Sequence, residues 1–440
     1  MAEAARTVKH YVSDCLQERH PYDAKKAFAG RPARDKGLVY SGFMPHTVDD
    51  WILSLSDTEV LDAQRVRTVR LLIAHSASQE AKITLLRKNI VEKVVAALIT
   101  TPSADFECQV FSLLRSLSVI SQGCYSVIQG GGLEAVVRSI QDRADLDERA
   151  HARETAAMVL FQISFNTAGL RWLLETDVPD GFELIDPPAS ASTCVFSKED
   201  VVDALVLILQ NDAQASSKIL LYATMCLAQL TSLTEGIFVA MKREAVSAVS
   251  KLLHGYATNT TTLDTDTGAQ VATFLLTVVW NVCLDQAGAD LIDTLGTPDD
   301  IFLLVAALYK SITPPNYPLL RALTGALSAV YKLLSVKMRS CESLDGDFSR
   351  IHVIFNFIRS LNFTVERCEK LEQELHSDVV AISKNLVLST HFAMEVKAVR
   401  DFTHQYLQEM QEIDAFYFRR QLFYSTKWEE EFDATVKTSY

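Results

Sequence analysis

The feature that most constrains the fold is a pattern that recurs along the chain: an apolar helix, a small residue, and further apolar helices. The stretch "SQGCYSVIQGGGLEAVVRSI", residues 121–140, shows it most clearly, with Gly123 as the small residue. Equivalent positions follow at intervals of 42 (81 to 123), 46 (123 to 169), 67 (169 to 236) and 52 (236 to 288) residues. We call them anchors; they are Ala81, Gly123, Gly169, Gly236 and Gly288. Self-similarity at such intervals indicates stacked repeats.

The two longest intervals contain segments rich in Pro, Gly, Ser, Thr and Asp, which predict loops. These segments read "TDVPDGFELIDPPASASTCVFS" and "GYATNTTTLDTDTG". Without about 20 and about 10 residues there, the period is about 42 to 47 residues, the armadillo/HEAT range. Each unit alone would expose an apolar face, so the units must stack. The sequence therefore predicts an all-α fold, a right-handed α-solenoid of armadillo/HEAT-like repeats.

The three consecutive glycines, residues 130–132, raise the alternative of a phosphate-binding loop. Such a loop requires G-x-x-x-x-G-K-[ST], and neither the Lys nor the Ser/Thr is in place. A dinucleotide-binding loop requires a preceding strand and G-x-G-x-x-G spacing. We therefore expect the glycines to form the turn between the second and third helices of a unit.

The phrase "LLRSLSVISQGCYSVIQGGGLEAVVRSI" resembles the repeat of the armadillo family, with an L-x-x-L helix, a short polar corner with Gly, and a V-V-x-L type helix. The resemblance covers roughly residues 60–337 and fades towards the C-terminal end. It implies a solenoid in which the last helices of the units line a concave groove that holds extended peptides or partner helices.

One repeat position suggests a peptide-binding column. Seven residues before the anchors, inside apolar helices, the chain has Ala74, Ser116, Gln162, Gln229 and Asn281. A buried amide needs a hydrogen-bond partner, and a bound peptide backbone could supply one. This arrangement resembles the nuclear-import armadillo receptors, in which an Asn column lies beside a Trp column; here Trp280 adjoins Asn281, but the other units lack Trp. The alternative is that these side chains cap or bridge neighbouring helices, and both interpretations stay open.

Residues 1–46 are predicted to form an extended basic arm. Its basic residues are Arg19, Lys25, Lys26, Arg31, Arg34 and Lys36. Acidic surfaces, such as that of tubulin, would attract this arm; the alternative is that it packs on its own acidic chain. The arm followed by armadillo units also resembles the axonemal armadillo proteins of the radial spoke, whose D-x-x-K-A phrase is matched by "DAKKA" at residues 23–27.

The C-terminal part differs from the predicted repeats in 47–340. Residues 341–400 contain apolar residues at spacings of three and four, which predict amphipathic helices that cap the solenoid or form a coiled coil with a partner. Residues 401–440 form a tail rich in aromatic and acidic residues. Aromatic and Arg side chains suit an interface anchor, on a neighbouring subunit or on the chain's own solenoid. The predicted anchor residues are Tyr417, Phe418, Arg419, Arg420, Phe423, Tyr424 and Trp428.

Composition and motifs bound the function. The net charge of −13 argues against nucleic acid as the main partner. The eight cysteines form no C-x-x-C pair, which favours reduced, buried thiols. We find no signal peptide, no apolar stretch of membrane-spanning length, no nucleophile elbow and no His cluster with metal-ligand spacing. We therefore expect no catalytic residues, no cofactor, no metal and no membrane partner.

The sequence thus predicts a non-enzymatic scaffold that binds other proteins, in the cytoplasm and cytoskeleton. The preferred setting is the axoneme of a cilium or flagellum, as part of the radial spoke, with axonemal subunits as partners and tubulin as a target of the arm. The alternative is a soluble cytosolic or nuclear-transport adaptor that binds linear peptides in the armadillo groove.

Overall fold

The computed structural model describes residues 45–57, 60–100, 103–142, 146–175, 197–211, 218–310 and 317–338. Within these ranges all regular elements are helices and no strand occurs, which confirms the predicted all-α class. The predicted basic arm up to residue 44, the helices of 341–400 and the aromatic tail of 401–440 lie outside the described residues. The chain divides into two compact units, one ending at Ser116 and the other beginning at Leu117.

The described residues of the first unit form five helices. They are α3 (Pro45–Ser56), α4 (Asp62–His75), α5 (Gln79–Arg87), α6 (Ile90–Thr100) and α7 (Ala104–Leu117), whose last residue already belongs to the second unit. Helix α3 packs on α4 and α6, and α5 packs on α6. Apolar residues at helical spacing, such as Leu72 and Val69 on α4, are fully buried between them.

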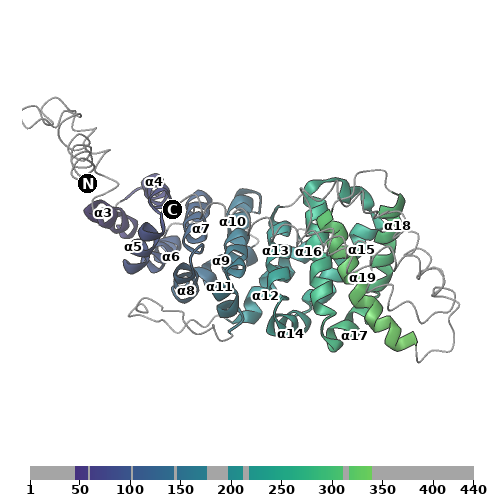
Figure 1. The fold of residues 1–440 in the computed structure, drawn as a ribbon. Coiled ribbons are helices and arrows are strands. Elements are labelled where there is room, and N and C mark those ends of the chain that lie inside the picture. Colours follow the sequence, from purple (N-terminus) through teal and green to yellow (C-terminus); the bar gives the residue numbers. More distant parts are fainter. Residues whose placement is uncertain are drawn as a thin grey trace, which may run out of the picture. The chain divides into compact units, whose positions relative to one another are not determined.

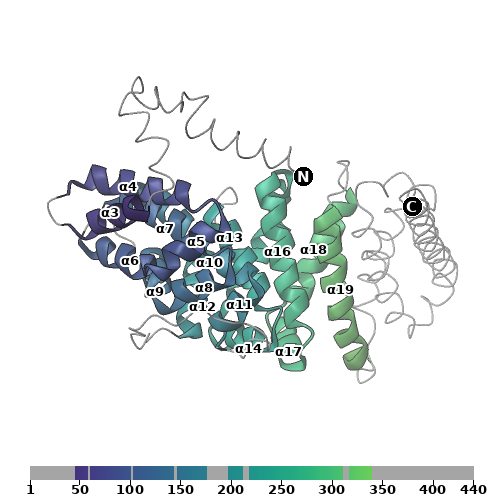
Figure 2. The same cartoon turned by 60° about the vertical axis from the view of Figure 1, so that its left-hand side comes forward.

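The second unit contains the remaining helices. They are α8 (Ser121–Gln129), α9 (Gly132–Gln141), α10 (Leu146–Phe165), α11 (Thr167–Leu173), α12 (Lys198–Asn211), α13 (Lys218–Leu230), α14 (Thr234–Lys242), α15 (Ala245–Thr258), the 3-10 helix η1 (Thr260–Asp264), α16 (Asp266–Val282), α17 (Gln286–Thr294), α18 (Thr297–Lys310) and α19 (Tyr317–Met338). Figures 1 and 2 show this succession from two directions. No described helix has both the length and the apolar character that a membrane span requires.

The helices recur in threes, and the middle helix of each triplet is short. Helices α5, α8, α14 and α17 have nine residues each and α11 has seven, whereas their neighbours have ten or more. In the second unit the first helices of successive triplets pack side by side, α10 on α13, α13 on α16, and α16 on α19. The third helices form a layer behind them, α9 on α12, α12 on α15, and α15 on α18. The first and third helices of the second unit thus pack on their equivalents in the adjacent triplets.

The anchor glycines explain why the short helices can cross so close to the preceding helix. A Cβ atom on the anchors Gly123, Gly169, Gly236 or Gly288 would lie under 3.0 Å from the carbonyl oxygen of the residue six positions earlier. Those oxygens belong to Leu117, Ile163, Leu230 and Val282, at or near the ends of the preceding helices. The repeated small residue is therefore a packing requirement of the corner between the first and second helices.

A left-handed residue ends each short helix. All described residues with positive φ fall at this place, one per triplet: Asn89, Gly131, Glu175, Glu244 and Gly296. Gly131, with φ 79°, belongs to the three consecutive glycines and connects α8 to α9. The predicted turn between the second and third helices is confirmed.

One predicted loop is mostly helical. In "GYATNTTTLDTDTG" the residues up to Thr258 finish α15, η1 follows, and α16 has begun by Asp266. Thr265 accepts a hydrogen bond from the backbone N–H of Gly268 at 3.1 Å, which caps α16. The polar composition that suggested a loop therefore reflects a cap and a 3-10 turn. The other predicted loop, from residue 176 to 196, lies outside the described residues.

Candidate protein-binding face

The predicted column follows the first helices of the triplets. Ala74 lies on α4, Ser116 on α7, Gln162 on α10, Gln229 on α13 and Asn281 on α16, each in the last two turns. Ala74 is exposed, and the other four side chains are half-buried. Four polar side chains thus occupy equivalent places, but their hydrogen bonds differ.

Asn281 joins two helices. Its Nδ2 donates to the carbonyl oxygen of Ala228 at 3.2 Å and lies 3.3 Å from Oγ1 of Thr231, both at the end of α13. Thr231 is buried and donates its own hydroxyl to the carbonyl of Leu227 at 2.9 Å. The amide of Asn281 therefore fastens α16 to the C-terminal end of α13.

Ser116 makes the corresponding contact in the first unit. Its Oγ lies 2.8 Å from Oγ of Ser76, which follows α4. Because Ser76 donates its hydroxyl to the carbonyl of Ile73 at 2.7 Å, Ser116 is the donor. Ser76 and Thr231 both lie five residues before an anchor. At Ser116 and Asn281 the geometry fits the helix-bridging alternative; peptide binding by the column stays a prediction.

Gln162 and Gln229 differ from Asn281. Neither side chain forms a hydrogen bond with any residue that the structure describes. Three aromatic rings lie on the same two helices: the ring of Phe161, next to Gln162 in the chain, lies 6.1 Å from that of Tyr222 on α13 and 5.7 Å from that of Phe165. Each of these two amides therefore keeps both a donor and an acceptor that a ligand could use.

These side chains belong to a continuous surface. Helix α13 packs on α10, α16 and α12, and α16 packs on α13, α19 and α15, so one side of each helix stays partly exposed. The exposed positions follow helical spacing and carry no charge over the C-terminal parts of α10, α13 and α16. We call this surface the aromatic–amide face: Met158, Phe161, Gln162, Phe165, Tyr222, Met225, Gln229, Phe274, Thr277 and Asn281. Aromatic, Met and amide side chains without charges are typical of interface cores.

Trp280, which the sequence paired with Asn281, packs on the next helix. Gly325 of α19 lies against the indole, and a Cβ atom there would lie under 3.0 Å from the ring. Trp280 therefore fills the contact between α16 and α19, and its side chain is half-buried. Ligand binding by Trp280 stays a prediction.

The sequence analysis overlooked three exposed apolar residues at one repeat position. Val119, Phe165 and Leu284 lie four residues before the anchors 123, 169 and 288, and are 53%, 65% and 71% exposed. The sequence contains this signal, because counting four residues back from each anchor, instead of seven, places these three apolar residues at one repeat position. Phe165 belongs to the aromatic–amide face, and Leu284 follows α16 at its edge.

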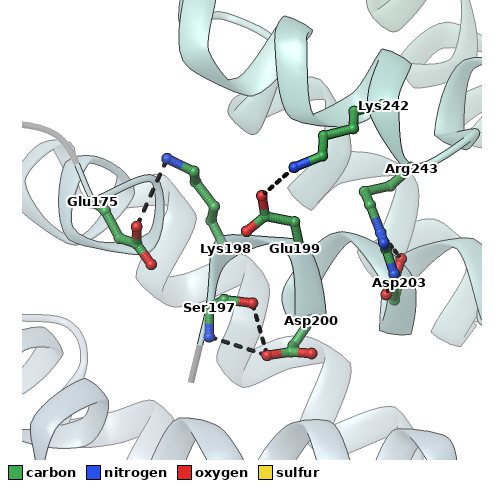
Figure 3. Close-up of polar contacts among 8 residues, drawn as sticks. All are labelled: Glu175, Ser197, Lys198, Glu199, Asp200, Asp203, Lys242 and Arg243. Carbon is green, nitrogen blue, oxygen red and sulfur yellow. Dashed lines mark hydrogen bonds and ion pairs between the residues drawn. The ribbon is translucent and has the colours of Figure 1, made fainter. Parts of the chain in front are cut away.

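Several charged side chains lie around the first turn of α12 (Figure 3). Lys198 approaches Glu175 at 3.7 Å, Lys242 donates to Glu199 at 3.1 Å, and Arg243 pairs with Asp203. Ser197 donates both its N–H and its hydroxyl to Asp200, at 3.0 and 2.9 Å, which caps α12. The hydrogen bond from Lys242 is the main cause that lowers the pKa of Glu199. These charges are paired within the protein, and exposed pairs of this kind contribute little to stability because water and salt screen them.

The described cysteines are buried and form no disulfide, as the sequence predicts: Cys108, Cys124, Cys226 and Cys283. Burial raises the pKa of Cys124, Cys226 and Cys283 to about 12, so their thiols are protonated at neutral pH. Among the described residues no group of three or more His, Cys, Asp or Glu side chains could hold a metal ion.

Comparison with known proteins gives little beyond this geometry. No model of a protein family matches the sequence, and no curated protein matches it. Two crystal structures of engineered proteins are similar in part. One is 17% identical, covers 65% of this chain and 96% of its own length, and has a TM-score of 0.47. The other is 17% identical, covers 80% of this chain and 91% of its own length, and has a TM-score of 0.36.

Proposed function

We propose that this protein is a non-enzymatic scaffold of the armadillo type, whose triplets form a right-handed α-solenoid. The aromatic–amide face is the observation that carries the proposal. It spans three packed helices, bears no charge, and includes Gln162 and Gln229 without hydrogen-bond partners among the described residues. Partly exposed aromatic and Met side chains of this kind, among which Phe165 is 65% exposed, gain free energy when a partner covers them.

The repeat architecture supports the same function. Helices that bury one another only through adjacent triplets leave a long uninterrupted surface, which is the usual binding surface of repeat proteins. An extended ligand on α10 and α13 would meet both the rings, for apolar contacts, and the two amides, for its backbone.

The test compares a double substitution with a single substitution, each in the full chain. Gln162→Ala with Gln229→Ala should reduce the capture of partner proteins, measured by quantitative proximity labelling in cells, while thermal unfolding stays near that of the wild type. The control Asn281→Ala should lower thermal stability instead. Unchanged partner capture by the glutamine variant, at wild-type stability, would contradict the proposal.

The cellular setting that we propose is the ciliary axoneme, as part of the radial spoke. Its support is the sequence alone: the basic arm with "DAKKA" at residues 23–27, followed by the helical repeats. In this setting the arm contacts acidic tubulin, and the partners are axonemal subunits. The second candidate, an adaptor for linear peptides in the cytosol or in nuclear transport, is favoured by the unpaired Gln162 and Gln229.

Detergent extraction of cilia separates the two settings. A structural component of the axoneme should stay in the pellet with the microtubules, whereas an adaptor should pass into the supernatant. Immunolocalisation to the cell body without signal on the axoneme would exclude the ciliary setting but leave the scaffold function intact.

A further inference from the structure

The aromatic–amide face restricts what can bind it. Since its centre carries no charge, the charged groups of a ligand must lie outside it, where water still solvates them. The rings of Phe161, Phe165 and Tyr222, together with Met225, favour aromatic or large apolar side chains. The ligand is therefore a segment dense in aromatic residues.

The margins of the face along α16 are acidic. Asp266 lies in the first turn of α16, on the side that carries Phe274 and Asn281 by helical spacing, and Asp285 follows the helix. From residue 252 to 309 the chain contains seven Asp and no Lys or Arg. Charge complementarity therefore favours a ligand that has basic residues beside its aromatic ones.

The chain itself contains a segment of this kind. Residues 414–428 read "DAFYFRRQLFYSTKW", with aromatic side chains next to Arg419, Arg420 and Lys427. The described part of the chain ends at Met338, which leaves 77 residues (339 to 415) before Phe416, the first aromatic residue of the segment. A connection of this length can extend to about 250 Å, and α16 with its 17 residues is only about 25 Å long, so the segment can reach the face.

We propose that the aromatic–amide face binds residues 414–428 of the same chain, so that partners must displace the chain's own C-terminal segment. The inference rests on the proposed binding function of this face. Attachment to the same chain favours this occupant, because a tethered segment has an effective concentration that a free partner in the cell rarely reaches. Gln162 and Gln229 then hydrogen-bond the backbone of the segment.

The experiment measures the binding of a fluorescein-labelled synthetic peptide of residues 414–428 to the full chain by fluorescence polarisation. The tail variant carries Phe416→Ala, Tyr417→Ala, Phe418→Ala, Phe423→Ala and Tyr424→Ala, which frees the face. It should bind the peptide at least about tenfold more tightly than the wild type, whose face is already occupied.

A matched pair of exposed phenylalanines locates the site. Phe165 on the face is 65% exposed, and Phe238 on α14, outside the face, is 63% exposed. In the tail variant Phe165→Ser should weaken peptide binding about tenfold, whereas Phe238→Ser should leave it unchanged. Because both side chains are mostly in solvent, both variants should fold, which circular dichroism verifies.

Three results would overturn the proposal. In the first, the peptide does not bind the tail variant. In the second, it binds the wild type and the tail variant with equal affinity. In the third, Phe165→Ser and Phe238→Ser reduce the affinity for the peptide equally. Sedimentation equilibrium adds a fourth: a wild-type dimer that the tail variant converts to a monomer would show binding to a second copy instead. If the peptide does not bind but the capture of partner proteins still depends on Gln162 and Gln229, this inference is wrong and the proposed scaffold function is still supported.

Discussion

The two sides of α13 show how one repeat position can take two roles. Towards α16, the amide of Asn281 is hydrogen-bonded to Ala228 and Thr231. Towards α10, the contact includes the rings of Phe161 and Tyr222, and the equivalent amides Gln162 and Gln229 have no partner among the described residues. The repeat position therefore determines where a side chain lies on its helix. Whether that side chain stabilises the fold or can bind a ligand depends on whether a hydroxyl or carbonyl group of the neighbouring helix lies within hydrogen-bond distance.

The largest effect should come from disrupting the corner between α13 and α14. The two oxygen atoms that accept the hydrogen bonds of Asn281, on Ala228 and Thr231, lie beside this corner. Gly236→Ala would place a Cβ atom against the carbonyl of Leu230, next to Thr231. We expect the free energy of unfolding to fall by about 1–3 kcal/mol, because the crossing of α14 over α13 must widen. Urea denaturation measures it. The control Gly255→Ala, on α15 with nothing within 4 Å of the new Cβ, should be neutral or slightly stabilising.

The next effect should come from Asn281→Ala. This change removes the bridge between α16 and α13 and leaves the carbonyl of Ala228 with one acceptor site unfilled. Because the site is half-buried, we expect a loss of about 1–2 kcal/mol in the free energy of unfolding. Asn281→Asp serves as a second variant, since it keeps the shape but loses the donor. A stability equal to that of the wild type in both variants would remove the distinction between the two sides of α13.

The opposite side can be sharpened with a double-mutant cycle. Phe161→Leu and Tyr222→Leu each remove a ring from the contact between α10 and α13, and the cycle isolates their mutual interaction. We expect a coupling free energy of about 0.5–1 kcal/mol, as for other tilted ring pairs. A coupling free energy near zero would mean that the interaction between the two rings does not stabilise the packing of α10 on α13.

The smallest effect should come from Gln229→Ala. Its side chain is half-buried and has no hydrogen bond to a described residue, so the free energy of unfolding should change by less than about 0.5 kcal/mol. Urea denaturation beside Asn281→Ala gives a direct comparison of two residues at the same repeat position. A loss as large as that of Asn281→Ala would show that Gln229 also stabilises the fold.

The architecture followed from local signals in the sequence. Apolar spacing predicted the helices, and the glycines at four of the anchors predicted the corners, because a Cβ atom at a position such as Gly236 would clash with the carbonyl of Leu230. The segment before α16 was misread, since Thr and Asp occur in caps and 3-10 turns as well as in loops.

The candidate site was predictable only in part. Counting from the anchors located Gln162, Gln229 and Asn281, since repeat position determines the place on the helix. The bond that holds Asn281 was not predictable, because it depends on Thr231, fifty residues earlier in the chain. The ring pair of Phe161 and Tyr222 was not predictable either, because the two residues lie on different helices and only the packing of α10 on α13 brings them together.

The left-handed residues at the ends of the short helices mark where extra chain can enter. After Asn89, Gly131, Glu244 and Gly296 the third helix begins at once, whereas after Glu175 the next helix, α12, begins only at Lys198. The chain thus already tolerates a long interruption at this point of a triplet. A small tag or a fluorescent reporter inserted after Glu244 would lie at the equivalent point, between the second and third helices of its triplet. It would not alter the aromatic rings and amides of the first helices.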